Sequence, residues 1–165
     1  MGIESGDDDV LRHVKKGTTG ALTIQAGKKA LAAGMKLSAM ILLGLGGQER
    51  TREHALHTAD VVSAINPTML SALSLIIPGD APLYQDVVFG KFTPLTARGF
   101  LEELDMILRH TEMSRPCIFR SNHVSNLLPV GGTLPMDKDA MLANLEQYIP
   151  NADNTRPLLN DNGNF

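Results

Sequence analysis

The stretch Leu37-Ser-Ala-Met-Ile-Leu-Leu43 decides the fold, because it is a compact apolar run without regular polar alternation. Such a run is typical of a strand that is buried on both faces of a parallel sheet. A glycine-rich turn at 44–47 ends the run, and residues 49–65 then repeat apolar side chains at helical spacing. A second apolar run follows at 69–77. Strand, helix and strand in this order predict an α/β fold with parallel strands.

The same pattern continues on both sides of this unit. We expect a helix at 18–33, a helix at 96–110, a strand at 116–120 and a closing helix at 137–148. Only three or four strands are visible, which is too few for a closed barrel of about eight strands. The prediction is therefore a partial (β/α) barrel with a strand–helix extension. Expected core positions of the three helices are Leu22, Ile24, Ala30, Leu31, Phe100, Leu101, Leu104, Ile107, Leu108, Met141, Leu142, Leu145 and Tyr148, and Glu102, Glu103 and Arg109 are expected on the solvated stripe.

Composition excludes several classes of function. The net charge of -3 and the lack of tryptophan argue against nucleic-acid binding. No apolar run approaches the roughly 20 residues of a membrane helix, and the acidic start is unlike a secretory signal. Cys117 is the only cysteine, so the sequence excludes an internal disulfide and a cysteine-rich metal site. We expect a buried Cys117 and a cytoplasmic protein.

Three blocks of residues resemble a known family. Gly2-Ile-Glu-Ser-Gly-Asp-Asp-Asp-Val-Leu11, with Lys15-Lys-Gly-Thr-Thr19, resembles the fourth strand and following helix of radical SAM (S-adenosylmethionine) proteins. Met40-Ile-Leu-Leu-Gly-Leu-Gly-Gly-Gln-Glu49 is similar to the fifth strand and its glycine turn, and 69–77 to the sixth strand. Residues 116–138 resemble the C-terminal extension of an Fe–S oxidoreductase subgroup. The resemblance predicts that 1–115 is half of a barrel, 116–150 an extension and 151–165 a polar tail.

The resemblance implies a parent enzyme that binds S-adenosylmethionine on a [4Fe–4S] cluster held by Cys-x3-Cys-x2-Cys. That motif is absent from this chain, and we expect it upstream of Met1 in the intact parent. No catalysis, bound cofactor or metal is therefore expected for this chain alone. The alternative is a stand-alone binding or scaffold domain, derived from such a barrel, with no cofactor role. In either case the exposed edge of the sheet predicts self-association.

The resemblance also suggests which residues serve the cofactor. Glu4 matches a strand-end residue that holds the cofactor, and Lys16 matches a basic residue that faces the methionine carboxylate. Met40 stands where the family has an acidic ribose ligand, and Ser38 is the candidate substitute. Leu43 and Gly44 would contact the adenine, and Ser5 completes the set. The alternative roles are a helix cap for Glu4 and Ser5 and a solvated helix-end charge for Lys16.

Other polar groups have simpler interpretations. Gly44-Leu-Gly-Gly47 lacks the further glycine of a dinucleotide loop, and His54 and His57 are spaced three apart rather than four, so we expect both on a solvated helix face. Arg120, Asn122 and His123 belong to a polar cluster after the strand at 116–120. They are candidates for lining a substrate site, or for satisfying the backbone of their own loop.

Overall fold

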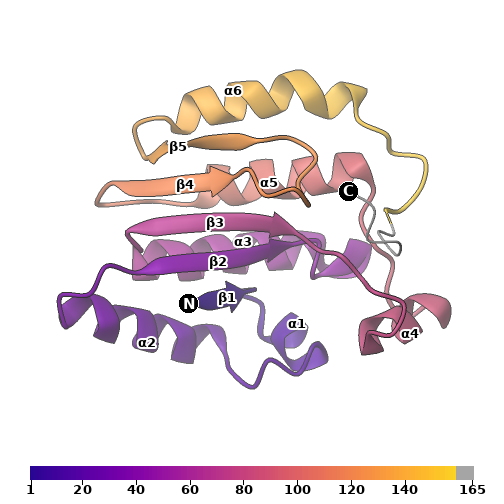
Figure 1. Cartoon of the computed structure of the whole chain (residues 1–165), viewed down its shortest axis with the longest axis horizontal. Helices are drawn as coiled ribbons and strands as arrows, with labels where there is room; N and C mark the ends of the chain where they lie inside the picture. The colour runs from indigo at the N-terminus through magenta and orange to yellow at the C-terminus, as the bar shows by residue number, and fades with distance from the viewer. Residues whose placement is uncertain (159–165) are drawn as a thin grey trace.

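A computed structural model describes residues 1–158 and contains one five-stranded sheet (Figure 1). Its strands lie side by side in chain order, the first four are parallel, and the last is antiparallel. They are β1 (Gly2–Glu4), β2 (Ser38–Leu43), β3 (Met69–Ser74), β4 (Cys117–Ser121) and β5 (Val130–Leu134). The predicted α/β class is thereby confirmed, and the open sheet is consistent with a partial barrel-like domain.

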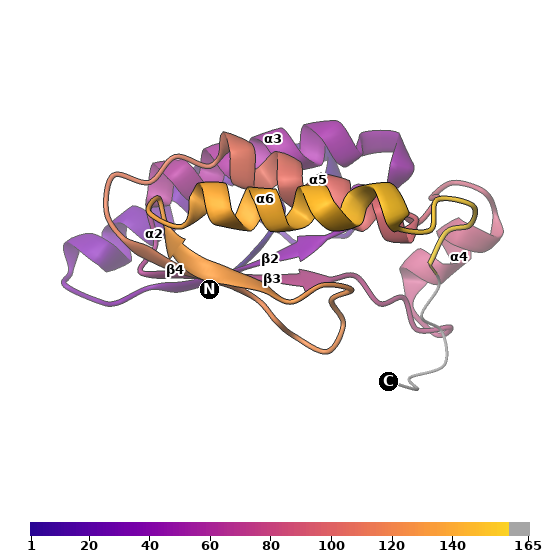
Figure 2. The same cartoon turned by 90° about the horizontal axis from the view of Figure 1, so that it is seen from above.

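Helices α3, α5 and α6 lie on the same side of the sheet (Figure 2). The helices are α1 (Asp8–His13), α2 (Gly20–Ala32), α3 (Gly47–Ile65), α4 (Pro82–Val88), α5 (Ala97–His110) and α6 (Lys138–Tyr148), followed by the 3-10 turn η1 (Ile149–Asn151). None of the described helices is long and apolar enough to cross a membrane. The hydrophobic core fills the space between the sheet and this helix layer.

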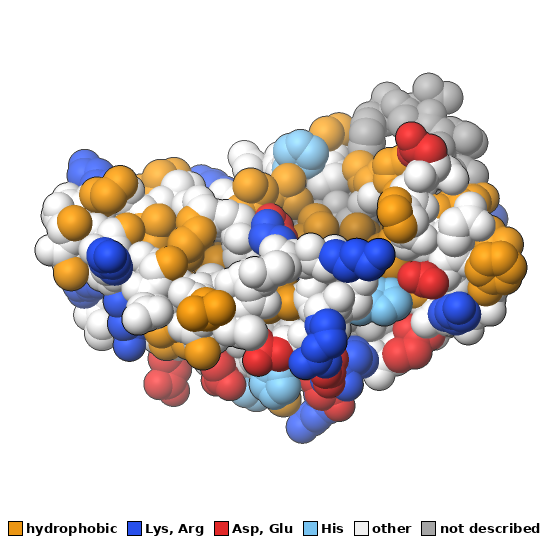
Figure 3. All heavy atoms as spheres, turned by 90° about the horizontal axis from the view of Figure 1, so that it is seen from below, with side chains coloured by type: hydrophobic (Ala, Val, Ile, Leu, Met, Phe, Trp, Pro, Cys, Tyr) orange, Lys and Arg blue, Asp and Glu red, His pale blue; other side chains and the backbone are white. Residues whose placement is uncertain are grey.

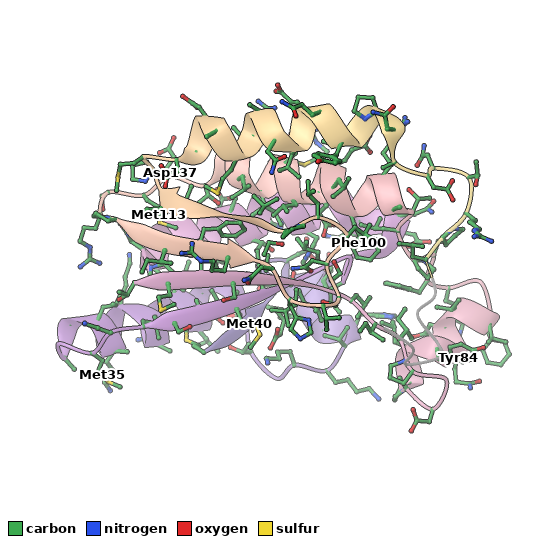
Figure 4. All side chains as sticks on the ribbon, turned by 45° about the horizontal axis from the view of Figure 1, so that its top comes forward. Met35, Met40, Tyr84, Phe100, Met113 and Asp137 are labelled. Carbon is green, nitrogen blue, oxygen red and sulfur yellow. The ribbon has the colours of Figure 1, made fainter. Side chains whose placement is uncertain are left out.

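The opposite face of the sheet is open. In β2 the side chains of Ala39, Ile41 and Leu43 are buried against the helices, whereas Met40 on the other face is 40% exposed. The prediction that this strand is buried on both faces is therefore wrong. Side chains alternate across a strand, and the helices within residues 1–158 cover one face of this sheet. We call the uncovered side the open face; Figure 4 labels Met40, which belongs to it.

The amphipathic pattern of α5 is confirmed on its apolar side, but Glu103 is only 1% exposed and does not lie on a solvated stripe. In α2, Thr23 and Gly27 are buried whereas Leu22 is 55% exposed, so its predicted core position is wrong. A side chain at position 27 would collide with Ile65, since a Cβ there would lie 2.8 Å from the Ile65 Cγ2 atom. Small residues thus bring α2 close to α3.

The structure departs from the prediction in three further places, at Tyr148, at β5 and at α4. Tyr148 at the end of α6 is exposed rather than inward, whereas Met141, Leu142 and Leu145 are buried as expected. Strand β5 and helix α4 have no counterpart in the prediction. Residues 151–158 run back along the start of α5, where the Leu158 N–H donates to the Leu95 carbonyl at 2.9 Å. The remainder of the predicted polar tail, 159–165, lies outside the described residues.

Candidate functional site at the carboxyl edge of the sheet

Glu4 and Lys16 meet where β1 ends. Lys16 Nζ donates to Glu4 Oε1 at 2.9 Å, and both side chains are partly exposed. Glu4 has a φ of 62°, in the left-handed region that non-glycine residues rarely adopt. Its carboxylate lies over Gly2, where a Cβ would be 2.2 Å from Oε1. Gly2 pairs with Met40, so this ion pair lies beside the open face.

Ser5 lies in the protein interior instead. Its hydroxyl is 2.8 Å from His54 Nδ1 and accepts a hydrogen bond from the Asp7 N–H at 3.0 Å. His54 Nε2 in turn lies 3.5 Å from Glu103 Oε1. The predicted solvated position of His54 is wrong, because its side chain is 0% exposed. Ser5, His54 and Glu103 are all inaccessible, so they form a structural network rather than a nucleophile with its base.

Glu103 extends this network to the turn after β2. Its Oε1 accepts from the Gly44 N–H and its Oε2 from the Thr51 hydroxyl, each at 2.6 Å. Gly44 has a φ of 81°, and a Cβ there would lie 2.5 Å from the Phe100 ring, which Figure 4 labels. Only glycine fits this turn. The two predicted site residues Ser5 and Gly44 thus bind His54 and Glu103 respectively, and these two buried side chains approach to 3.5 Å without a hydrogen bond. We call Ser5, His54, Thr51, Glu103 and the Gly44 N–H the buried network.

Leu43 and Ser38 are placed differently from the Glu4–Lys16 pair. Leu43 is buried and faces the helix layer, on the side away from the open face. Ser38 begins β2, and its carbonyl accepts a hydrogen bond from the Met1 ammonium at 2.7 Å. Strand rise of roughly 3.3 Å per residue places the two ends of this six-residue strand about 16 Å apart. Ser38 therefore lies at the opposite end of the sheet from Gly44.

A cavity of about 480 Å³ lies between α1 and α4, beyond the ends of β2 and β3. Ligands of parallel α/β sheets bind at this carboxyl edge. Its walls include Val14, Leu45, Leu75, Ile76, Ile77 and Leu83. His13 and Asp86 lie 3.2 Å apart among the lining residues. Sequence reasoning missed this cavity, although the apolar residues 75–77 beyond the strand end were a signal. Lys15 and Leu45, which line it, are direct neighbours of the predicted residues Lys16 and Gly44.

A second hollow of about 400 Å³ lies between α1, α2 and α3. Figure 3 shows the side of the molecule with α1 and α2, where charged side chains gather over α1. Asp7 is buried here and caps α1, and it contacts Arg50 Nη2 at 2.8 Å and His57 Nδ1 at 3.0 Å. Burial raises the pKa of Asp7, but hydrogen bonds from Arg50, Val10 and His57 outweigh it and lower the pKa to about 2. This carboxylate is satisfied by protein donors.

The polar cluster after β4 binds backbone groups at the carboxyl end of β3. Only the first half of β3 pairs with β4. Beyond it, Asn126 Nδ2 donates to the Ala72 carbonyl at 2.8 Å, and the Ser125 hydroxyl accepts from the Ser74 N–H at 3.2 Å. His123 Nδ1 is 2.9 Å from the Ser125 hydroxyl. This part of the cluster serves the backbone.

Arg120 and Asn122 are both exposed, and Arg120 projects from the open face of β4.

Residues 1–158 contain no group of three or more histidine, cysteine, aspartate or glutamate side chains arranged to hold a metal ion. Cys117 is buried as predicted, and burial raises the pKa of its thiol to about 11. A thiolate ligand is therefore strongly disfavoured at this position.

Neither a protein-family model nor a curated protein matches the chain. Among solved structures, the chain is similar to archaeal Methanocaldococcus infernus Elp3 with an N-terminal deletion (1-46), with a TM-score of 0.58 and 16% identity. The match covers 91% of this chain but only 35% of the Elp3 chain. The likeness therefore establishes the fold alone: the chain is an α/β unit built like about one third of the Elp3 structure.

Proposed function

We propose that this chain is the C-terminal part of a radical SAM iron–sulfur oxidoreductase, that it contributes part of the S-adenosylmethionine pocket, and that it is not catalytic alone. The cavity between α1 and α4 carries the proposal, because it lies at the carboxyl edge of the parallel strands and combines apolar walls with nearby charges. Similarity of fold to part of Elp3, a radical SAM protein, supports the same assignment.

The residues present fit the organic cofactor but not an iron–sulfur cluster. The apolar walls around Leu45 and Ile76 suit the adenine base, and Glu4 and Lys16 suit the ammonium and carboxylate of the methionine part. Binding would exchange their mutual ion pair for contacts to the zwitterion, so no net charge would be buried. The bound cofactor would supply radical chemistry only in the intact parent, where an electron from the [4Fe–4S] cluster would cleave it. Ser38, at the far end of β2, has no part in this arrangement.

A scaffold domain without a cofactor role is the second candidate. The observation in its favour is that Glu4 and Lys16 neutralise one another at 2.9 Å, as a purely structural pair would. The two candidates differ in what replacing these residues does. If the pair serves the cofactor, the substitutions lower affinity for S-adenosylmethionine without lowering affinity for adenosine. In a scaffold domain neither ligand binds.

The test is a titration of the isotope-labelled chain with adenosine and with S-adenosylmethionine, followed by backbone amide NMR shifts. A dissociation constant near 1 mM, equivalent to about 4 kcal/mol, is a realistic expectation for adenosine in half a pocket. The shifts should fall on residues 44–45 and 75–77, and Ile76→Gln should remove them. The control Leu22→Gln changes an exposed position on α2 and should have no effect. Shifts confined to the hollow around Asp7, or none at all, would overturn the proposal.

A further inference from the structure

Side chains of the open face form ordered rows across the sheet. In one row Gly2, Met40, Ser71, Arg120 and Gly131 lie next to one another on β1 to β5. The adjacent row contains Ser38, Met69, Ile118 and Thr133. Most of these residues are apolar or uncharged, and Met40, Met69 and Ile118 are among the exposed large hydrophobic side chains. Arg120 is therefore the one charged side chain in these two rows.

The position of Arg120 is fixed by its neighbours. Its Nη1 donates to the Phe119 carbonyl at 2.7 Å and to the Gly132 carbonyl at 3.1 Å. The stem lies across Gly131, where a Cβ would be 3.2 Å from the Arg120 Cδ atom. Any larger residue at 131 would displace the stem. The guanidinium group is thus held by the β4–β5 hairpin.

The remaining donors of Arg120 are available to a ligand. Its Nε and Nη2 groups make no hydrogen bond with residues 1–158, and no acidic side chain there forms an ion pair with it. Nε–H and one Nη2–H run parallel and match the two oxygens of a carboxylate or phosphate. The nearby Glu4–Lys16 pair is already neutralised, so it does not compensate the charge of Arg120.

We propose that the open face binds a small molecule with one anionic head, a carboxylate or a phosphate, and an apolar body. Arg120 holds the head through Nε and Nη2, and the apolar body lies on Met40, Met69 and Ile118. Charge complementarity selects this occupant, because an anionic head accepts both hydrogen bonds and neutralises the guanidinium, whereas an uncharged head offers only weaker, neutral acceptors. The proposal rests on the sheet geometry and does not depend on S-adenosylmethionine binding.

Octanoate, octyl phosphate and octanol are the probes, because they share one chain and differ in the head group. Binding is followed by NMR shifts of the Arg120 Nε–H group and of the amides of Met40, Ser71 and Gly131. We expect one of the two anions to bind at least about tenfold more tightly than octanol, the range of one charge-assisted contact. The anion that binds more tightly identifies the head group.

Arg120→Gln should reduce the affinity for the preferred anion to that for octanol, while octanol binding is unchanged. Arg120→Lys should retain part of the difference in affinity between the preferred anion and octanol, because a lysine supplies the positive charge without the two parallel N–H donors of arginine. Arg52→Gln is the matched control, since Arg52 is exposed on α3, on the helix side of the sheet. Equal affinities of octanol and both anions for the unmodified protein would overturn the proposal. Anion binding that survives Arg120→Gln would also overturn it. Unchanged thermal unfolding confirms that the variants are folded.

Discussion

Glu103 on α5 accepts a hydrogen bond from the backbone N–H of Gly44 at 2.6 Å, so a buried carboxylate holds the turn that follows β2. The same side chain reaches Thr51 and His54 on α3, and His54 reaches Ser5 after β1. Through these contacts the ends of two neighbouring strands are tied to one acidic residue. The arrangement predicts that substitution of Glu103 alone lowers the stability of the folded protein by a large amount.

Glu103→Ala should lower the free energy of unfolding by about 3 kcal/mol, because it leaves the buried Gly44 N–H without an acceptor and removes the acceptor of the partly buried Thr51 hydroxyl. Glu103→Gln retains an oxygen for Gly44 and should cost less. Urea unfolding measures both. The neighbouring exposed residue supplies the control, since Glu102→Ala should change stability by less than about 0.5 kcal/mol. Equal effects at positions 102 and 103 would contradict the structural role of the buried network.

Stability should fall in acid because of Asp7. Its pKa is about 2 in the folded protein, against an ordinary value of 3.8. A lowered pKa stabilises the folded state above pH 3.8, and this contribution is lost as the pH falls towards 2. The full contribution is about 2 kcal/mol. Urea unfolding between these pH values should show this loss, and Arg50→Met should reduce it. A pH-independent stability in this range would contradict the prediction.

Gly44→Ala should destabilise the protein more than Gly34→Ala. Both glycines have nearly the same positive φ, 81° and 80°, so the backbone strain is matched at about 1 kcal/mol. Only position 44 adds a collision, with the Phe100 ring, whereas nothing lies within 4 Å of a Cβ at position 34. The collision should cost a further 1–3 kcal/mol, roughly the range for overpacked cores. Thermal unfolding of the two variants gives the difference directly.

Strand β1 forms an edge of the sheet, and we expect it to pair with a second copy of the chain. Sedimentation velocity over about a hundredfold range of protein concentration should show a monomer–dimer equilibrium. Amide hydrogen exchange at Gly2 and Glu4 should slow as the dimer forms. A monomer throughout the range would exclude edge pairing.

Cys117 should resist thiol reagents in the native protein. Its side chain is fully buried, and burial raises its pKa to about 11, so the reactive thiolate is scarce at neutral pH. Labelling with a chromogenic disulfide should proceed only at the rate of unfolding and become rapid in urea. Rapid labelling of the folded chain would show that β4 opens locally.

The α/β class and the stripe of α5 follow from local periodicity, which the sequence displays directly. Strand β5 escaped prediction because Gly131 and Gly132 have low strand propensity and no side chain to alternate. The same glycines make room for Arg120 and Asp137, a constraint visible only in three dimensions. Glu103 was misplaced for a similar reason. A charged residue is expected in solvent unless its partners are known, and its partners are 52 and 59 positions away in the chain.

The Glu4–Lys16 pair shows how far a candidate site can be predicted. A resemblance suggested both residues, and the fold brings them together at 2.9 Å. The cavity at the carboxyl edge depends on α4, a short helix that the sequence analysis did not predict and that has no fully buried residue. Its location follows from the tertiary fold alone.

The hydrogen bonds of Asn126 have a consequence for how this chain can change over evolutionary time. β3 extends beyond the part that pairs with β4. There the Asn126 side chain replaces the hydrogen bond of a neighbouring strand, because its Nδ2 donates to the Ala72 carbonyl and to the Ser121 hydroxyl. Val124 and Leu127 beside it are exposed and are free to drift. Related sequences should therefore retain an asparagine at position 126 within a segment that otherwise varies in both length and composition.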